Sequence, residues 1–395
     1  MTRKLDVLIA GAGIGGLAAA ASLLVRGHHV RVFEQSPKLG EVGAGIQVSA
    51  NGVKVLYDLG LKDALEKVVV RPQAFEFRRY DSGELLQRMP LGASHEEAFG
   101  APYYHVHRAD IHAILAAKVM ELAPRAISLN ARAVGFEEGP QGVTLLLEDG
   151  SRHSGDVLVG SDGIKSAIRK GIMGETPAIY TGHVAWRATI PKERLPADIM
   201  EQVVTLWCGP KNHAVIYWLC SGQVLNFVGC VEYEEWEEES WTLKRPWGEL
   251  KAAYEGFHPD VQTIIDAIDK DQCYRWAMNN RKPVHNWSTQ RATLLGDAVH
   301  PTLPYLASGA VMAIEDGAVL ARCLSGDEDI PAALQRYQRN RSDRTARIVN
   351  ESTEHGSFYH ITDAEEMKRA FAERNITKSR AEWLYCYDPL QVELV

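Results

Sequence analysis

Basic residues are not in excess in this chain, and cysteines are few. The 43 Lys and Arg residues against 51 Asp and Glu residues leave a net charge of −8, which argues against nucleic acid or an anionic membrane as the main partner. The six cysteines form no Cys-x-x-Cys pair and do not cluster as zinc ligands do, so we expect no metal site. Scattered cysteines in a large chain are typical of a reducing, cytoplasmic protein.

Long apolar runs are also missing beyond the N-terminus. Arg3 and Lys4 precede the apolar stretch Leu5–Val25, which resembles a secretory signal. That stretch contains Asp6 and several glycines, and a strand–glycine turn–helix interpretation explains it better. No other apolar run is long enough to cross a bilayer, so we expect no membrane span.

The N-terminal segment has the pattern of a βαβ unit. Leu5–Ala10 reads as a buried strand, Gly11–Gly16 as a turn, Leu17–Arg26 as a helix and Val30–Phe33 as the next strand. Short apolar segments that fit the same parallel sheet return at 157–159 and 292–295.

The middle of the chain has a different period. Residues 72–91 and 180–231 alternate apolar and polar side chains and contain turn signals, as antiparallel strands do. Residues 232–239 are acidic and are interpreted as a solvated edge. Helical patterns follow at 309–324, 330–355 and 364–384.

The order of these segments predicts an α/β fold in which two domains are interleaved. Residues 1–71, 100–176 and 282–330 form a discontinuous Rossmann-like dinucleotide-binding domain in this interpretation. Residues 72–99 and 177–281 form an antiparallel-sheet substrate domain, and 331–395 form a C-terminal helical segment. A length of 395 residues suits two such domains.

The glycine turn has the spacing of a dinucleotide site. Gly11 permits the tight turn, Gly13 lets the backbone approach a pyrophosphate, and Gly16 allows close packing of helix on strand. The helix N-terminus then faces the phosphates. Glu34, at the end of the second strand, is placed to accept hydrogen bonds from an adenosine ribose. This motif alone does not separate FAD from NAD.

Two further motifs follow apolar strands. One begins at Asp162-Gly163, and the other begins at Gly296-Asp297 and leads to Gly309 before a helix. In this order, after this glycine turn, they resemble the group A FAD-dependent aromatic hydroxylases, the family of salicylate, 3-hydroxybenzoate and 6-hydroxynicotinate monooxygenases. The resemblance extends from Leu5 to about Val349.

The resemblance implies a bound FAD and NADH or NADPH as a transient co-substrate, with hydroxylation through a C4a-hydroperoxyflavin. Arg108 would contact the diphosphate side of FAD, Asp162 would bridge the FAD and nicotinamide sites, and Asp297 would hold the ribityl chain. The helix that starts near Gly309 and Ala310 would aim N–H groups at the flavin N1–C2=O edge, where reduced flavin is anionic.

Candidate catalytic residues lie on a predicted antiparallel strand. His213 and Tyr217 share one face of it by period two, and their Cα atoms lie roughly 13 Å apart, so they are placed to flank a small ring. His-x-x-x-Tyr resembles the 3-hydroxybenzoate and 6-hydroxynicotinate enzymes, and histidine is the natural base near neutral pH. A packed strand histidine is the alternative interpretation. Gln47 is a further candidate near the flavin ring.

Weaker candidates complete the predicted substrate site. Arg187 is suited to bind a substrate carboxylate bidentately or to brace a domain interface. Pro301 would stiffen the loop beside the flavin, and Tyr305 would line the pocket. Many relatives have Gln or Gly where this chain has Ser308, which changes hydrogen bonding near the substrate or flavin.

The sequence therefore predicts a cytoplasmic monooxygenase, monomeric or homodimeric, that acts on a small aromatic acid with O₂. One alternative is an enzyme of the same fold that acts on a larger multi-ring substrate or as an epoxidase. Others are an NAD-dependent dehydrogenase, for which we find no acid–base pattern, and a non-catalytic FAD-binding protein. The choice of acid, simple or decarboxylating hydroxylation, and NADH or NADPH stay open.

Overall fold

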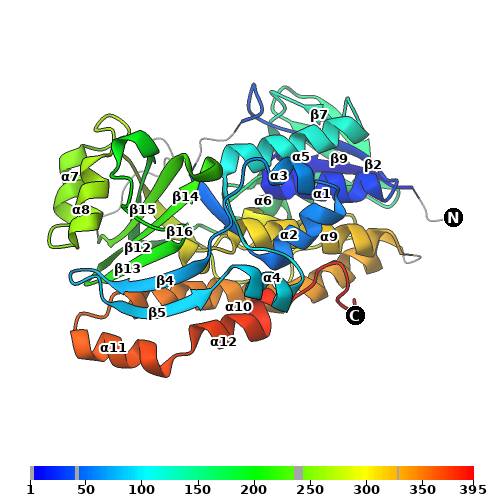
Figure 1. Cartoon of the computed structure of the whole chain (residues 1–395). Helices are drawn as coiled ribbons and strands as arrows, with labels where there is room; N and C mark the ends of the chain where they lie inside the picture. The colour runs from blue at the N-terminus through cyan, green and yellow to red at the C-terminus, as the bar shows by residue number, and fades with distance from the viewer. Residues whose placement is uncertain (1–3, 41–43, 235–242, 327–328) are drawn as a thin grey trace.

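Two large β-sheets organise the chain in the computed structural model, which describes residues 4–40, 44–234, 243–326 and 329–395 (Figure 1). The first is a five-stranded sheet in which every strand pair is parallel. In spatial order its strands are β17 (Ala292–Leu294), β11 (Val157–Gly160), β1 (Asp6–Ala10), β2 (His29–Phe33) and β7 (Ile127–Ser128). The apolar runs of β1 and β11 are buried, as strands covered on both faces require.

Helix α1 (Ile14–Val25) connects β1 to β2 and packs against α5 (Arg108–Leu122) and α9 (Gly309–Leu324). It starts inside the glycine turn, three residues earlier than the sequence predicts. Glycine makes this possible, because a Cβ on Gly16 would lie 2.1 Å from the carbonyl oxygen of Gly11. Gly317 of α9 meets the backbone of Ala19 at a similarly close approach, so the two helices lie nearly in backbone contact.

The second sheet has seven strands and is antiparallel except where β13 pairs with β4. In spatial order its strands are β16 (Tyr274–Asn280), β12 (Ile179–Pro191), β15 (Val224–Glu232), β14 (Asn212–Leu219), β13 (Val204–Gly209), β4 (Ala74–Arg79) and β5 (Leu85–Pro90). Helices α7 (Trp247–Ala253) and α8 (Pro259–Asp266) cover one face of it over an apolar cluster that includes Trp186 and Phe227. The other face contributes Phe77 and Tyr217 to a separate cluster.

Two small sheets and several short helices precede the C-terminal helices in the chain. β3 (Gly45–Val48) pairs with β6 (Tyr104–His107), and β8 (Ala133–Gly139), β9 (Gly142–Leu147) and β10 (Arg152–Gly155) form a three-stranded antiparallel sheet. The remaining short helices are α2 (Ala50–Asp58), α3 (Lys62–Leu65), α4 (Ala93–Phe99) and α6 (Ala167–Met173).

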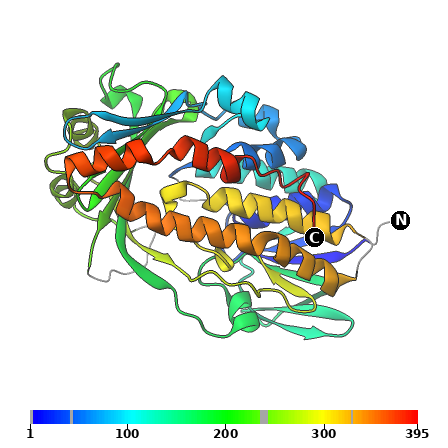
Figure 2. The same ribbon diagram turned by 90° about the horizontal axis from the view of Figure 1, so that it is seen from below.

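The C-terminal helices lie along the underside of the molecule, where α9, α10 (Ile330–Tyr359), α11 (Ala364–Glu373) and α12 (Ile376–Arg380) run beside one another (Figure 2). Asp329 starts α10 by accepting a hydrogen bond from the Ala332 N–H. The helix continues four residues past the predicted end at 355. The helix expected over 364–384 is interrupted, because Arg374 is extended and the Asn375 side chain caps a new helix at the Lys378 N–H.

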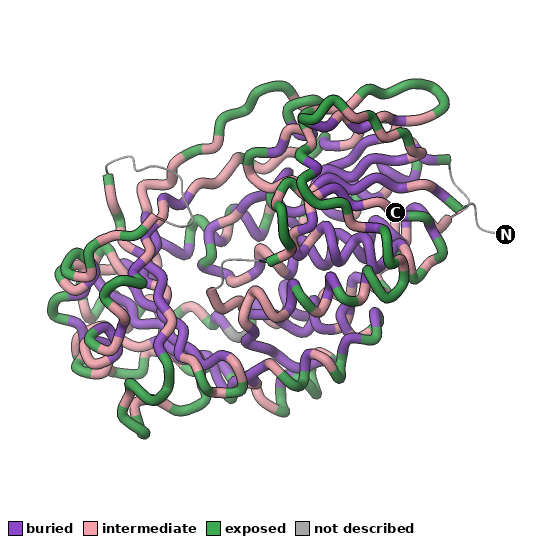
Figure 3. The backbone as a smooth tube through the Cα atoms, turned by 90° about the horizontal axis from the view of Figure 1, so that it is seen from above, coloured by how far each residue is buried: buried purple, intermediate pink, exposed green. Residues whose placement is uncertain are grey.

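The inner strands of the two large sheets are largely buried, whereas loops and outer helix surfaces are exposed (Figure 3). Within the described residues, every helix is too short or too polar to cross a bilayer. The predicted α/β class with C-terminal helices is confirmed. The predicted domain boundaries stay a prediction. They are supported by the two large sheets, because each sheet takes its strands from the segments predicted for one domain.

Candidate active site

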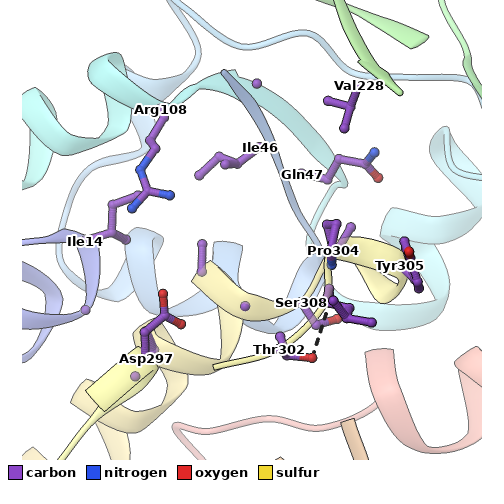
Figure 4. Close-up of a pocket in the computed structure, with 18 of the residues that line it drawn as sticks. Ile14, Ile46, Gln47, Arg108, Val228, Asp297, Thr302, Pro304, Tyr305 and Ser308 are labelled. Atoms are coloured by element: carbon purple, nitrogen blue, oxygen red, sulfur yellow. Dashed lines mark hydrogen bonds between the residues drawn. The ribbon is translucent and has the colours of Figure 1, made fainter. Parts of the chain in front are cut away.

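A cavity of about 330 Å³ opens where the glycine turn, β3 and the antiparallel sheet meet. Its walls come from segments far apart in the chain, and Figure 4 shows them converging. Arg108, Ile14 and Asp297 lie on one side of the view, and Gln47, Val228 and Tyr305 lie on the other. The cavity therefore has a charged side next to the parallel sheet and a more apolar side against the antiparallel sheet.

The N-terminus of α1 borders the charged side, where Gly13, Ile14, Gly15 and Gly16 line the cavity. Gly11 has φ +100°, a left-handed conformation that side-chain-bearing residues rarely adopt. No side chain caps α1, and its first turn contains no acidic residue. The helix therefore presents N–H groups and the positive end of its dipole to the cavity.

Glu34 lies beside this turn. Its carboxylate accepts hydrogen bonds from the backbone N–H groups of Ala12, at 2.8 Å, and Ser36, at 2.9 Å. These bonds hold an anionic oxygen next to the turn, at the carboxyl end of β2, as the sequence predicts for a ribose ligand.

A second helix N-terminus faces the same cavity. Helix α9 starts at Gly309, and Gly309 and Ala310 line the cavity. Ser308 precedes the helix, but its hydroxyl donates to the Leu306 carbonyl at 2.8 Å instead of capping α9. Ala307 holds a left-handed φ of +51°, which turns the chain into the helix. The N–H groups of the first turn of α9 are thus directed at the cavity.

The predicted base and its partner come together on β14. His213, Val215 and Tyr217 all line the cavity, as period two requires. Burial lowers the pKa of His213 well below its usual value, with a smaller effect of His360 and His183, and burial raises that of Tyr217. Both side chains are therefore uncharged near pH 7. Gln47 also lines the cavity, and its amide oxygen accepts from the Tyr103 hydroxyl at 2.7 Å.

Comparison with known proteins supports this picture. The family model described as "FAD binding domain" matches residues 4–352. The chain is 38% identical to a 3-amino-4-hydroxybenzoate 2-monooxygenase of Streptomyces platensis, over 92% of this chain and 90% of the relative. It is 37% identical to a 3-hydroxybenzoate 6-hydroxylase of Polaromonas naphthalenivorans, over 96% of each chain. It is 35% identical to a 6-hydroxynicotinate 3-monooxygenase of Pseudomonas fluorescens, over 88% of this chain and 90% of the relative.

The chain belongs to the FAD-dependent aromatic hydroxylases.

Among solved structures, the fold is similar to Klebsiella pneumoniae HpxO complexed with FAD and uric acid, with a TM-score of 0.84, 29% identity and 96% of both chains covered. The resemblance stated from the three motifs is thereby confirmed, as is FAD as the cofactor.

The site of this hydroxylase fits FAD on its own geometry. Two uncapped helix N-termini open into one cavity, as a diphosphate and an anionic reduced ring require. Arg108 and Asp297 line the same cavity. A side chain at Gly15 would collide with Leu295 and Ala313, and one at Gly16 with Gly11, so these glycines allow close packing of α1, whereas Gly13 borders open space in the cavity.

Asp162 is placed differently from the prediction. Its carboxylate accepts from the Ser166 hydroxyl and, at 2.7 Å, from the Ala167 N–H, so it caps α6. Burial raises the pKa of Asp162, although these hydrogen bonds act against it. The neighbours Ser161 and Gly163 line the cavity, so this motif reaches the cofactor side through backbone.

Other predicted residues also lie away from the cavity. Arg187 and Pro301 are not among the described residues that line it, whereas Tyr305 is. Arg187 is buried and its guanidinium lies over the rings of Tyr274 and Trp276, which are on the neighbouring strand of the same sheet, so both interpretations of Arg187 stay predictions.

The sequence interpretation missed Tyr103, which holds Gln47, and His360, which lies 2.8 Å from His213. Tyr103 directly precedes β6 and belongs to none of the motifs found in the sequence. His360 is 147 residues away from His213 in sequence, so no local signal connects them.

Proposed function

We propose that this chain hydroxylates a small aromatic or N-heteroaromatic acid with a ring hydroxyl, using NAD(P)H and O₂. The main observation behind the proposal is that one cavity is lined by the N-termini of α1 and α9 and by His213 and Tyr217, which are buried and neutral. The relatives support it, since their names specify hydroxybenzoates and a hydroxynicotinate.

Several residues of this chain would hold FAD. The N–H groups after Gly13 and Arg108 would bind the pyrophosphate, and Glu34 the adenosine ribose. Asp297 would bind the ribityl chain, and the start of α9 at Gly309 would face the pyrimidine edge of the flavin. Gly11 and Gly16 shape the turn, and Asp162 supports it by capping α6.

Bound FAD supplies the transfer of electrons from NAD(P)H and the activation of O₂. His213 accepts the proton of the ring hydroxyl, which raises the electron density of the ring carbon that is to be hydroxylated. Tyr217 and Gln47 orient the ring by hydrogen bonds, with Tyr305 beside them. Apolar walls from Val215 and Val228 keep water from the reacting carbon.

Arg187 and Pro301 have supporting roles in this proposal, because they are not among the described residues that line the cavity. The enzyme acts as a monomer or homodimer in the cytoplasm. No disulfide joins any of the six cysteines, all of which lie in the described part of the chain, and this supports a reducing compartment.

A screen of hydroxylated aromatic acids for stimulation of NADH and NADPH oxidation, with the product mass measured, tests the proposal. We expect one monocyclic hydroxy acid to stimulate oxidation strongly and to gain one oxygen. His213→Ala lowers that turnover roughly 100-fold while FAD stays bound, because the base is lost. His285→Ala, at a histidine whose side chain is 60% exposed, is the control. Unchanged turnover in His213→Ala would remove His213 from the mechanism.

A larger substrate is the second candidate, because the HpxO structure contains uric acid, a two-ring heterocycle. The same screen includes two-ring heterocyclic acids and alkenes. Stimulation by these alone would favour the multi-ring or epoxidase alternative.

A further inference from the structure

Behind the cavity wall, three side chains form a continuous hydrogen-bonded row. His213 Nδ1 lies 2.8 Å from His360 Nε2, and His360 Nδ1 lies 2.7 Å from Glu232 Oε1. His213 comes from β14, His360 follows the last residue of α10, and Glu232 ends β15. The row therefore joins two neighbouring strands of the antiparallel sheet to the end of α10, which is more than 120 residues away in sequence.

The row leads from a buried end to an exposed end. His213 lines the cavity and is buried, and the His360 side chain is 2% exposed, whereas the Glu232 side chain is 39% exposed. One end of the row thus touches the substrate cavity and the other touches solvent.

We propose that His213, His360 and Glu232 form a proton relay that carries the proton of the substrate hydroxyl from the closed cavity to the protein surface. The proposal deepens the proposed function and rests on it, because it requires a ring hydroxyl next to His213.

The relay solves a charge problem at His213. Burial lowers the pKa of His213 well below its usual value, so an imidazolium ion at this position is costly. When the substrate O–H bond breaks, its proton binds His213 Nε2. The Nδ1 proton of His213 passes to His360 Nε2, and the Nδ1 proton of His360 passes to Glu232. Both imidazoles end neutral, and the proton leaves from a solvated carboxyl group.

Among the described residues, the tyrosines and cysteines around His213 do not offer a second acceptor. Tyr254, Tyr305, Tyr359, Cys208 and Cys230 surround His213, and burial raises the pKa of each one, so they stay protonated near neutral pH.

His183 is also near, with its ring 5.9 Å from that of His360, but its Nδ1 lies 2.9 Å from the Thr181 carbonyl oxygen. His183, Glu232 and His360 are close enough to suggest a metal site. A metal bound by His360 Nδ1 and Glu232 would replace the hydrogen bond that now joins these two groups. The geometry therefore favours proton transfer.

The test follows ionisation of the ring hydroxyl directly. FAD-loaded enzyme without NAD(P)H is mixed with the hydroxy acid from the screen, and phenolate absorbance is recorded by stopped flow over a range of pH. Glu232→Gln keeps an oxygen that accepts from His360 but takes up no proton. We expect ionisation to slow about tenfold or more in this variant and in His360→Gln.

Three controls separate a relay from a structural role. Glu234→Gln makes the same change at an exposed residue two positions away and should ionise the ligand at the wild-type rate. Added formate should restore the rate in Glu232→Gln, and Glu232→Asp should keep most of it. FAD absorbance shows that each variant is folded and loaded.

The two possible failures are distinct. Equal ionisation rates in Glu232→Gln, His360→Gln and wild type would overturn the relay alone. If no acid binds and ionises in the wild type, the proposed function fails, and the relay fails with it.

Discussion

His95 and His213 are both buried, but their surroundings differ. His213 lines the cavity and is hydrogen-bonded to His360. His95 lies among the rings of Phe99, Tyr103 and Tyr385, and its Nε2 has no hydrogen-bond partner. Burial lowers the pKa of His95 to about 4. We propose a catalytic role for His213, whereas His95 lowers the stability of the protein in acid.

We expect His95→Phe to make the protein less sensitive to acid. Between pH 6.5 and about 4 the unfolded chain binds a proton at His95 that the folded chain does not, so the free energy of unfolding falls as the pH falls. This loss amounts to about 1.4 kcal/mol per pH unit for one such histidine. Denaturant unfolding at pH 7 and pH 5 measures it, and the variant should lose less stability between these values than wild type.

His285→Phe is the matched control, because the side chain of His285 is 60% exposed. An equal pH dependence in His95→Phe and His285→Phe would contradict the assignment.

At the scale of elements, α9 and α10 are joined by buried charges. Arg341 of α10 contacts Glu315 and Asp316 of α9, each at 2.7 Å, and all three side chains are fully buried. Asp316 also accepts from the Gly296 N–H at 3.1 Å and contacts His300 at 2.7 Å. Burial alone would raise the pKa of Asp316, but His300 and Arg341 outweigh it and lower the pKa to about 2.

We expect Arg341→Leu to destabilise the protein by about 3–5 kcal/mol, because it removes one cationic partner from each of two buried carboxylates. Arg347→Leu removes an exposed pair with Glu351 on the same helix and should cost less than about 1 kcal/mol. Unfolding midpoints in urea distinguish them. Similar losses for both variants would show that the buried pairs add nothing.

At the scale of the whole molecule, the cofactor side is built from parts that lie far apart in the chain. The α1 turn, Arg108, Asp297 and Gly309 all line one cavity. A ligand that contacts all of them must cross-link the parallel sheet to α9, so binding and global stability are coupled.

FAD at 100 times its Kd should therefore raise the free energy of unfolding by about 2.7 kcal/mol. FMN at the same concentration should stabilise less, because it has no adenosine diphosphate for the glycine turn and Glu34. Thermal unfolding with each nucleotide measures the difference, with Asp297→Ala expected to reduce the FAD effect. Failure of purified, FAD-supplemented protein to take up any FAD would refute the cofactor site.

Much of the fold was predictable because its signals are local. The apolar runs at β1 and β11, the glycines at 11, 13 and 16, and the alternation along β14 all act within a few residues. Period two also placed His213 and Tyr217 on one face of their strand correctly. Helix ends were less predictable. The start of α1 depends on the close approach of Gly16 to Gly11, and the break near Arg374 depends on the side-chain cap by Asn375.

The sequence by itself determined the fold class, the family and the cofactor, because steric limits on glycine and the periods of strands and helices are written in neighbouring residues. Tertiary structure alone decided what surrounds each candidate. Packing of the end of α10 on the antiparallel sheet brings His360 to His213, and the start of α6 draws the Asp162 carboxylate away from the cavity. Such contacts depend on how whole helices and strands pack together, and no pattern among neighbouring residues predicts this packing.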